Sequence, residues 1–315
     1  MKQRILTRLC LLALVLAMLL AMPGCSKYRI EMSNTRQSEV MLTVDGTEVA
    51  YEVVYFFYCT YRDAYPEESF ERRMARVKSS ICELYGIFTL SREYAIDPYG
   101  DEVNETLDEM VVEMIDSFPT RRDYIARLSD QHMTDAVSRL LLRSYICQEL
   151  LLSEMEDELE DEELLTAFLG REDVIRVLSM TLDFGDQTEA MRRRAEEIMQ
   201  ALSECEDTDE AFLEIARRKA TAENAHSYLT TAQWHSLCGT EGGTPAIGSI
   251  SEPLYEGTTC LIMRVSEKDL AYAKENPDEI GISYLECAIR DTAASLTATY
   301  TPNEAYLTLT EESFA

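Results

Sequence analysis

The stretch MLTVDGTEVAYEVVYFFYCTYRDAY, residues 41–65, decides how the fold begins. Its first part holds two short β-prone runs, 41–44 and 47–49, on either side of Asp45-Gly46. Asp-Gly between such runs is a strong signal for a tight turn. The second part carries seven aromatic side chains at helical spacing: Tyr51, Tyr55, Phe56, Phe57, Tyr58, Tyr61 and Tyr65. The stretch therefore predicts a hairpin, or a strand and a turn, that leads into an aromatic helix.

This aromatic helix has apolar side chains nearly all round, which leaves two interpretations of its tyrosine face. Tyr51, Tyr55, Tyr58 and Tyr65 recur on one side, together with Arg62, at steps of four and three residues. A helix that is apolar on most sides is usually buried in a core. In the alternative interpretation this face contacts a partner, and the four tyrosines are then candidates for binding a client polypeptide.

Apolar residues farther along the chain repeat with a period of 3.6 residues. They predict helices at 70–88, 107–118, 120–128 and 133–151, so residues 67–153 are expected to be all-helical. Residues 154–163 are nearly all acidic and lack the glycine and the alternate spacing of a calcium loop. We expect them to form the solvated face of a connecting helix.

The pattern changes after Gly170. A run rich in β-branched residues at 174–182 predicts a strand, and periodic apolar residues predict helices at 191–202 and 212–216. A loop at 238–248 and a strand at 261–265 follow. The order β, α, α, loop, β predicts a compact α+β domain. Residues 280–298 resume a helical pattern, and residues 300–309 are expected to be an extended tail.

The N-terminus has the layout of a signal peptide, so residues 1–24 are expected to be removed. Three basic residues precede the uncharged run 9–22, which is followed by Pro23, Gly24 and Cys25. The other interpretation is a membrane-spanning helix, but crossing the hydrocarbon takes about 20 apolar residues and Pro-Gly interrupts this run earlier. Gly24 before Cys25 resembles the lipobox of bacterial lipoproteins and predicts lipidation of Cys25. Ordinary secretion with Cys25 as a free thiol is the alternative.

The chain is strongly acidic, with 29 Lys and Arg against 58 Asp and Glu. Removal of residues 1–24 takes away three basic residues, which leaves 26 against 58 and a formal charge of −32. Such a charge repels phosphate and anionic membrane surfaces, so a nucleic-acid partner is excluded and membrane contact is expected through the lipid alone. The size and the 46% hydrophobic content suffice for two domains with cores.

Cysteine, histidine and motif usage gives no sign of a metal or a cofactor. The seven cysteines after Cys25 are scattered singly without a CxxC pair, which indicates buried apolar residues rather than a disulfide framework. His132, His226 and His235 share no ligand spacing with one another or with the cysteines. The sequence holds no P-loop, GxGxxG, GxSxG or HExxH. We therefore expect neither a metal nor a cofactor.

Three local motifs, in this order, resemble the PrsA/SurA family of exported foldases over nearly the whole chain after Cys25. Val44-Asp45-Gly46-Thr47-Glu48-Val49 is similar to the segment that opens the family's chaperone helices. Arg176-Val177-Leu178-Ser179-Met180 occupies the place of the first strand of its parvulin domain. The stretches at 247–254 and 260–265 are similar to the end of that domain. The resemblance implies a mainly helical α+β fold: a SurA/trigger-factor-like helical chaperone block with an inserted parvulin-like α+β domain.

The chain departs from the family at the positions that parvulins use for prolyl isomerisation. Ser179 stands where the first of two histidines is expected and Leu261 where the second is expected. The barrier to rotation about the peptide bond is about 20 kcal/mol, and parvulins lower it by holding proline beside those hydrogen-bonding histidines. No catalytic residue is therefore assigned. Ser179, Met180, Leu229, Trp234 and Leu261 are candidates for a remaining peptide-binding pocket, and ordinary core packing is the alternative.

The resemblance implies a domain layout. It consists of a signal peptide at 1–24, a lipidated tether at 25–40, a helical chaperone-like domain at 41–169, a parvulin-like domain at 170–268, and a C-terminal helix and tail at 269–315 that packs back on the helical domain. The expected function is that of a lipid-anchored chaperone on the extracytoplasmic face of the cell membrane, which binds unfolded exported polypeptides. An active prolyl isomerase and a lipid-anchored structural or solute-binding protein are the alternatives, and the oligomeric state is left open.

Overall fold

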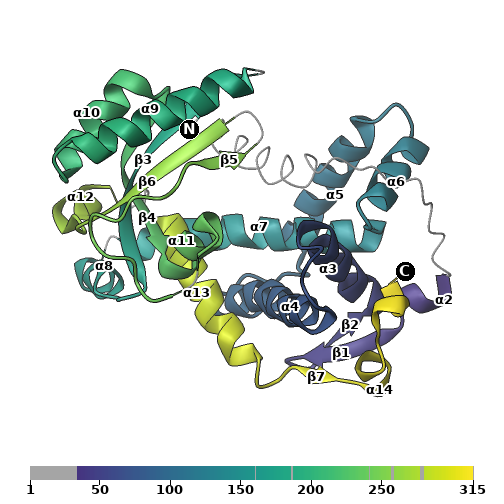
Figure 1. The fold of residues 1–315 in the computed structure, drawn as a ribbon. Helices are drawn as coiled ribbons and strands as arrows, with labels where there is room; N and C mark the ends of the chain where they lie inside the picture. The colour runs from purple at the N-terminus through teal and green to yellow at the C-terminus, as the bar shows by residue number, and fades with distance from the viewer. Residues whose placement is uncertain are drawn as a thin grey trace. The chain divides into compact units, whose positions relative to one another are not determined.

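The computed structural model of the protein describes residues 34–159, 161–185, 187–240, 242–256, 259–276 and 280–314. The signal peptide and Cys25 lie outside these residues. The chain divides into two compact units: residues up to Leu150 together with the stretch from Ile289 form unit 1, and the uninterrupted stretch Leu151–Ala288 forms unit 2. Figure 1 shows a mainly helical chain with two small sheets, which confirms the predicted fold class with an inserted α+β part.

The sheet of unit 1 begins with the predicted tight turn. β1 (Val40–Val44) and β2 (Thr47–Ala50) pair antiparallel around Asp45 and Gly46, which both have positive φ, at 49° and 74°. A two-residue hairpin turn of type I′ requires positive φ at both positions. β7 (Thr301–Pro302) pairs with the other edge of β1 and gives the order β2-β1-β7. The sheet thus joins two stretches of chain that are about 260 residues apart.

Helices make up the rest of unit 1. They are α2 (Asn34–Gln37), α3 (Tyr51–Ala64), α4 (Phe70–Glu93), α5 (Asp101–Asp116), α6 (Arg121–Asp130), the first part of α7 (Asp135–Glu158), the last part of α13 (Gly281–Leu296), α14 (Glu304–Leu307) and the 3-10 helix η2 (Glu311–Phe314). Ser69 and Thr120 cap α4 and α6, because their side chains accept hydrogen bonds from backbone N–H groups of the first turn.

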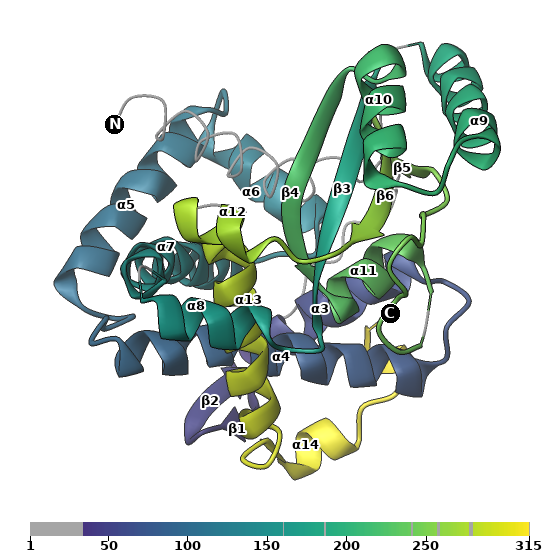
Figure 2. The same cartoon turned by 90° about the vertical axis from the view of Figure 1, so that its left-hand side faces the viewer.

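Unit 2 is built on a four-stranded antiparallel sheet of order β4-β3-β6-β5. Its elements are the end of α7, α8 (Glu162–Leu169), β3 (Val174–Asp183), α9 (Thr188–Glu204), α10 (Asp209–Lys219), β4 (Ala222–Thr230), α11 (Thr231–Cys238), β5 (Leu254–Glu256), β6 (Thr259–Ser266), α12 (Leu270–Glu275) and the start of α13. Figure 2 shows α9 and α10 on one side of the sheet and α11 on the other. The two faces carry separate cores, because alternate residues of a strand point to opposite faces.

Two predictions of secondary structure need correction. The sequence predicted no element between the helix at 212–216 and the loop at 238–248, yet β4 and α11 lie there, and β5 follows the loop. β4 reads AENAHSYLT, which has little β-propensity, and it becomes a strand because it pairs along β3. Residues 300–309 were expected to be extended, but only Thr301–Pro302 is a strand. Asn303 then caps α14 by accepting a hydrogen bond from the backbone of Tyr306 at 2.9 Å.

The boundaries between the two compact units fall at 150/151 and 288/289, within α7 and α13. The sequence placed the domain bounds at 169/170 and 268/269. Those bounds were assigned by resemblance to a family, whereas the structural units reflect compactness, so the domain assignment stays a prediction.

Helices α4 and α13 approach closely within unit 1 at Gly86. A Cβ at this position would lie 3.2 Å from the backbone nitrogen of Ala293 and 3.3 Å from the carbonyl oxygen of Ile289. Both neighbours are backbone atoms, which cannot move aside as the end of a side chain can. Glycine at position 86 therefore sets the separation of the two helices.

Replacing Gly86 with leucine is expected to lower the free energy of unfolding by about 1–3 kcal/mol, because the added side chain overpacks the contact with α13. Ala75→Leu, on an exposed side of the same helix, is the matched control and should change stability by about 0.5 kcal/mol or less. Urea unfolding of the full chain, followed by circular dichroism, measures both. Equal midpoints for the two variants would contradict the close approach.

Candidate functional site

The predicted tyrosine face of α3 is buried, and a distant stretch of the same chain covers it. Tyr51 and Tyr55 are each 3% exposed, and Tyr58 has no exposed surface. The ring of Phe314 in η2 stacks on all three, with ring centroids 6.1, 6.3 and 3.9 Å away, respectively. Phe314 is itself only 1% exposed. The structure therefore brings Tyr51, Tyr55 and Tyr58 together around one inserted aromatic ring.

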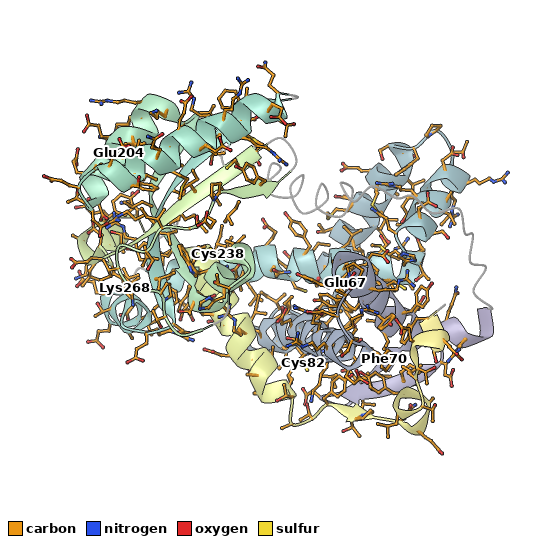
Figure 3. All side chains as sticks on the ribbon, in the orientation of Figure 1. Glu67, Phe70, Cys82, Glu204, Cys238 and Lys268 are labelled. Carbon is orange, nitrogen blue, oxygen red and sulfur yellow. The ribbon has the colours of Figure 1, made fainter. Side chains whose placement is uncertain are left out.

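Phe70, at the start of α4, also contacts this ring. Its centroid lies 6.3 Å from that of Phe314 and 5.7 Å from that of Tyr58. Figure 3 shows Phe70 beside the yellow C-terminal segment. Aromatic pairs at such distances add about 0.5–1.5 kcal/mol to the free energy of burying the rings themselves. We call the site formed by Tyr51, Tyr55, Tyr58 and Phe70 the aromatic pocket.

Polar side chains at the rim of the aromatic pocket hold the backbone of η2. The Tyr51 hydroxyl donates a hydrogen bond to the carbonyl oxygen of Ser313 at 2.6 Å. Nη1 of Arg62 donates to the carbonyl oxygen of Phe314 at 3.2 Å. These contacts use main-chain oxygens, so they would hold many sequences in the same conformation.

A buried guanidinium supplies the charge recognition. Nη1 of Arg73 lies 2.9 Å from a carboxylate oxygen of Glu311, and the Arg73 side chain is only 5% exposed. Its Nη2 donates to the carbonyl oxygen of Pro66 at 2.7 Å, while its Nε has no hydrogen-bond partner among the described residues. A buried cation with incomplete hydrogen bonding favours a nearby carboxylate strongly, because an uncompensated buried charge is costly.

Several other ionisable groups lie near the pocket, and burial keeps two of them neutral. Burial raises the pKa of the Cys59 thiol to about 11, and burial also raises the pKa of Tyr55, so both groups are neutral at neutral pH. Nε2 of His132 lies 3.0 Å from the carboxylate of Asp63 and 3.5 Å from a guanidinium nitrogen of Arg62. The pocket can therefore bind an aromatic ring and a carboxylate, but it presents no activated nucleophile among the described residues.

Tyr65 does not belong to this site. It is 42% exposed, stacks on Tyr61 with ring centroids 6.3 Å apart, and lies under the guanidinium of Arg76 at 4.4 Å. The helix ends at Ala64, so Tyr65 leaves the face that the other three tyrosines share. Of the four predicted client-binding residues, the structure brings three together and separates the fourth.

The predicted pocket of unit 2 is divided between the two faces of its sheet. Leu229, Trp234 and Leu261 belong to the core on the α11 face, and Ser179 faces the same side because it lies two residues along β3 from Val177. Met180 is buried in the other core, among the side chains of α9 and α10. The structure thus brings four of the five candidates to one face and separates Met180 from them.

The α11 face holds apolar side chains at the place where a parvulin-like site is expected. Trp234 is 5% exposed and Met263, which pairs with Ser179, is 2% exposed. Of the histidine side chains that the structure describes in unit 2, His235 contacts the loop instead, through Thr240 at 2.8 Å and the carbonyl oxygen of Gly243 at 2.9 Å. Figure 3 labels Cys238, at the end of α11, which also packs on this face. The face can bury apolar atoms, but it offers little hydrogen bonding to a peptide carbonyl.

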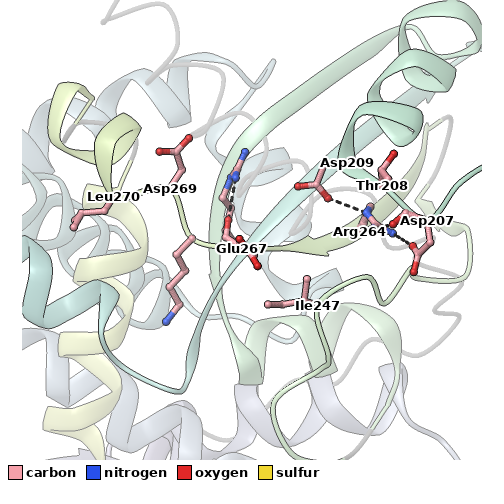
Figure 4. A pocket seen from close by; sticks show the side chains of 10 residues that line it. Asp207, Thr208, Asp209, Ile247, Arg264, Glu267, Asp269 and Leu270 are labelled. Atoms are coloured by element: carbon pink, nitrogen blue, oxygen red, sulfur yellow. Dashed lines mark hydrogen bonds and ion pairs between the residues drawn. The ribbon is translucent and has the colours of Figure 1, made fainter.

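A charged cavity of about 440 Å³ in unit 2 was not predicted. Its lining includes Arg176, Asp207, Asp209, Arg264 and Lys268 (Figure 4). Arg264 is 4% exposed, and its Nε lies 3.0 Å from Asp209 while Nη1 contacts Asp207. Nζ of Lys268 donates to the carbonyl oxygens of Leu169 and Arg171, and burial lowers its pKa while Asp173 acts in the opposite direction.

The sequence did contain one signal for this cavity. Arg264 interrupts an apolar strand at a position that alternates with Cys260 and Ile262, and a buried arginine needs acidic partners. Asp207 and Asp209 supply them from the segment that starts α10. Arg264 is already paired with these two carboxylates. The charged side chains that line the cavity therefore serve mainly as a structural ion-pair network.

The residues that the structure describes contain no helix that is long and apolar enough to cross a membrane. Nor do they contain a group of three or more His, Cys, Asp or Glu side chains arranged to hold a metal ion.

The chain is similar to solved structures of PrsA foldases, whereas no family model and no curated protein matches it. The foldase PrsA of Lactococcus lactis is 11% identical, with 85% of this chain and 96% of that chain covered and a TM-score of 0.26. PrsA of Bacillus anthracis, a peptidylprolyl isomerase, is 13% identical, with 71% and 100% covered and a TM-score of 0.28. PrsA of Streptococcus pneumoniae is 14% identical, with 88% and 97% covered and a TM-score of 0.27. These are members of the family that the sequence motifs resemble. At such TM-scores the likeness carries no argument about what this chain binds or catalyses.

Proposed function

We propose that this protein is an extracytoplasmic, lipid-anchored chaperone that binds unfolded exported polypeptides through unit 1 and does not catalyse prolyl isomerisation. The observation that carries the proposal is that the aromatic pocket already holds a short peptide segment, η2. It does so by inserting one aromatic ring and by hydrogen bonding to two backbone carbonyl oxygens. A site that binds a short segment of its own chain in this way has the chemistry to bind segments of other chains.

The chemistry of a chaperone site fits these contacts. Unfolded chains expose aromatic side chains and unpaired backbone carbonyl groups, and the aromatic pocket binds both kinds of group. Burial of an aromatic ring removes about 150–250 Å² from water, which gives a substantial driving force that does not depend on a long sequence. The formal charge of −32 that remains without residues 1–24 keeps a protein that carries such complexes soluble.

The apolar α11 face of unit 2 supports the absence of isomerase activity. Rotation about a prolyl bond is slow because the bond has partial double-bond character, and an enzyme must stabilise the twisted state by hydrogen bonding. Ser179 is only half-buried beside Met263, and the side chains of Leu261 and Trp234 pack in the apolar cluster on the same face. Unit 2 would then act as a folded support, and its isomerase-like architecture would not by itself give activity.

The chain lacking residues 1–25 is expected to suppress aggregation of an unfolding client protein in a concentration-dependent way. In the same preparation, the isomerisation rate of a proline-containing peptide should equal the uncatalysed rate, because the face near Ser179 lacks the required donors. Light scattering and a peptide isomerisation assay measure the two activities, and Ser179→Ala serves as the control. A catalysed rate that falls in Ser179→Ala would contradict the proposal in favour of an active isomerase. Absence of any suppression would contradict the chaperone function itself.

Cys25 is proposed as the site of lipid attachment. Two or more acyl chains anchor a protein stably, whereas the acidic protein surface repels an anionic membrane. Cys25→Ala in the full chain, expressed in a bacterium that processes lipoproteins, should therefore move the protein from the membrane fraction to the soluble fraction with its circular dichroism unchanged. Cys59→Ala, at a buried cysteine, is the control and should stay with the membranes. Membrane retention of Cys25→Ala would show that Cys25 does not carry the anchor.

A further inference from the structure

The segment that fills the aromatic pocket is held at few points. The four residues of α14 are all at least partly exposed, and Leu307 is 71% exposed. Among the described residues after α14, only Leu309 and Phe314 are buried, at 8% and 1% exposure. Opening of a segment with so few buried apolar contacts costs less free energy than global unfolding. Residues 310–314 can therefore leave the pocket without the rest of unit 1 unfolding.

The geometry of η2 explains which of its side chains are recognised. A 3-10 helix has three residues per turn, so side chains three positions apart lie on the same side. Glu311 and Phe314 are three positions apart, and they contact Arg73 and the aromatic pocket, respectively. The Glu311 side chain is 67% exposed, and it reaches the buried Arg73 with one carboxylate oxygen, whereas Glu312, which follows it, points to another side of the 3-10 helix. The site therefore recognises an acidic residue and an aromatic residue that follows it by three positions.

The two recognition elements are of different kinds. Tyr51 and Arg62 bind main-chain oxygens, which every peptide has. Arg73 favours a carboxylate, because its guanidinium is a buried cation and its Nη1 pairs with Glu311 at 2.9 Å. The rings of Tyr58 and Phe70 favour an aromatic side chain, because both contact the ring of Phe314. Sequence preference thus resides in two positions of the bound peptide.

We propose that the aromatic pocket, together with Arg73, is a binding site for peptide segments in which an acidic residue precedes an aromatic residue by three positions, and that Glu311–Phe314 is its resident intramolecular ligand. Client segments of this pattern compete with Glu311–Phe314 and displace it. The proposal rests on the proposed chaperone function and specifies its client class and its regulation.

Competition with a tethered segment sets the affinity for clients. A segment joined to its site by a short linker has an effective concentration of about 1 mM. A free peptide with the same contacts must compete with that concentration, so its apparent dissociation constant is raised by the ratio of the effective concentration to the intrinsic constant. The resident segment would thus protect the buried tyrosines from nonspecific contacts and release them only to well-matched or abundant clients.

The test uses a fluorescent peptide of sequence Thr-Glu-Glu-Ser-Phe-Ala, that of residues 310–315, and fluorescence anisotropy. A chain truncated after Thr310 should bind this peptide at least about tenfold more tightly than the full chain does, because the tethered competitor is gone. Phe314→Ala in the full chain should have the same direction of effect. Leu307→Ala, at an exposed apolar position outside the pocket, is the matched control and should bind as the unmodified chain does.

Peptide variants test the two recognised positions. A peptide with Glu311→Gln or with Phe314→Ala should bind the truncated chain at least fivefold more weakly, and Glu312→Gln, at the exposed neighbouring acid, should have little effect. A second measurement needs no variant of the protein. Saturating peptide should speed backbone hydrogen exchange of residues 310–314 in the full chain, because these residues leave the pocket.

The outcomes separate this inference from the function on which it rests. A truncated chain that keeps its circular dichroism but binds the peptide no better than the full chain does would overturn the inference. Unchanged hydrogen exchange at residues 310–314 under saturating peptide would also overturn it, even if truncation prevents folding. If the full chain suppresses aggregation in either case, the chaperone function stands without the resident ligand. Tight, pattern-dependent peptide binding without any suppression would support the site and refute the chaperone function.

Discussion

Unit 1 depends on contacts between the C-terminal stretch of the chain and the stretch at the start of the fold. β7 pairs with β1, α13 contacts α4 at Gly86, and Phe314 fills the aromatic pocket, so three separate contacts join the C-terminal stretch of unit 1 to its N-terminal stretch. The entropy cost of closing a loop grows only with the logarithm of its length, by about 0.6 kcal/mol for each doubling. A whole folded unit can therefore be inserted between the two halves of unit 1 at small thermodynamic cost. The same closure delivers η2 to the aromatic face of α3.

The aromatic face of α3 is covered by η2, a distant segment of the same chain. A helix with six aromatic residues exposes a large apolar patch unless other elements bury it, and such patches promote association. Tyr51, Tyr55 and Tyr58 are buried in this structure, and η2 covers them. The two interpretations of α3, a core helix and a binding face, are therefore compatible. A face covered by a short, separable segment is part of the core when the segment is bound and a binding surface when it is released.

Local signals predicted the parts of the fold that local interactions form. The Asp45-Gly46 turn and the periodic helices after residue 70 were recognised because their determinants lie within a few residues. β4 was missed because its strand conformation comes from pairing with β3. The partnership of Phe314 with Tyr58 joins residues about 250 positions apart, and no pattern in either stretch points to the other. Likewise Met180 was grouped with Trp234, although strand alternation and the position of α11 place them on opposite faces.

The α11 face of unit 2 is packed as a second core. Buried hydrogen-bonding groups cost about 1–3 kcal/mol when they lack partners, so a polar pair kept at positions 179 and 261 would need a ligand or water to satisfy it. Leu261 removes this requirement, and Trp234 on α11 fills the adjoining space with apolar surface. The two side chains thus bury apolar surface together on this face. The charges of unit 2 gather instead around Arg264, on the face of α9 and α10, where Asp207 and Asp209 neutralise the buried guanidinium. Both faces of the sheet thereby contribute to the stability of unit 2, the α11 face through apolar burial and the other face through apolar burial and the ion pairs of Arg264.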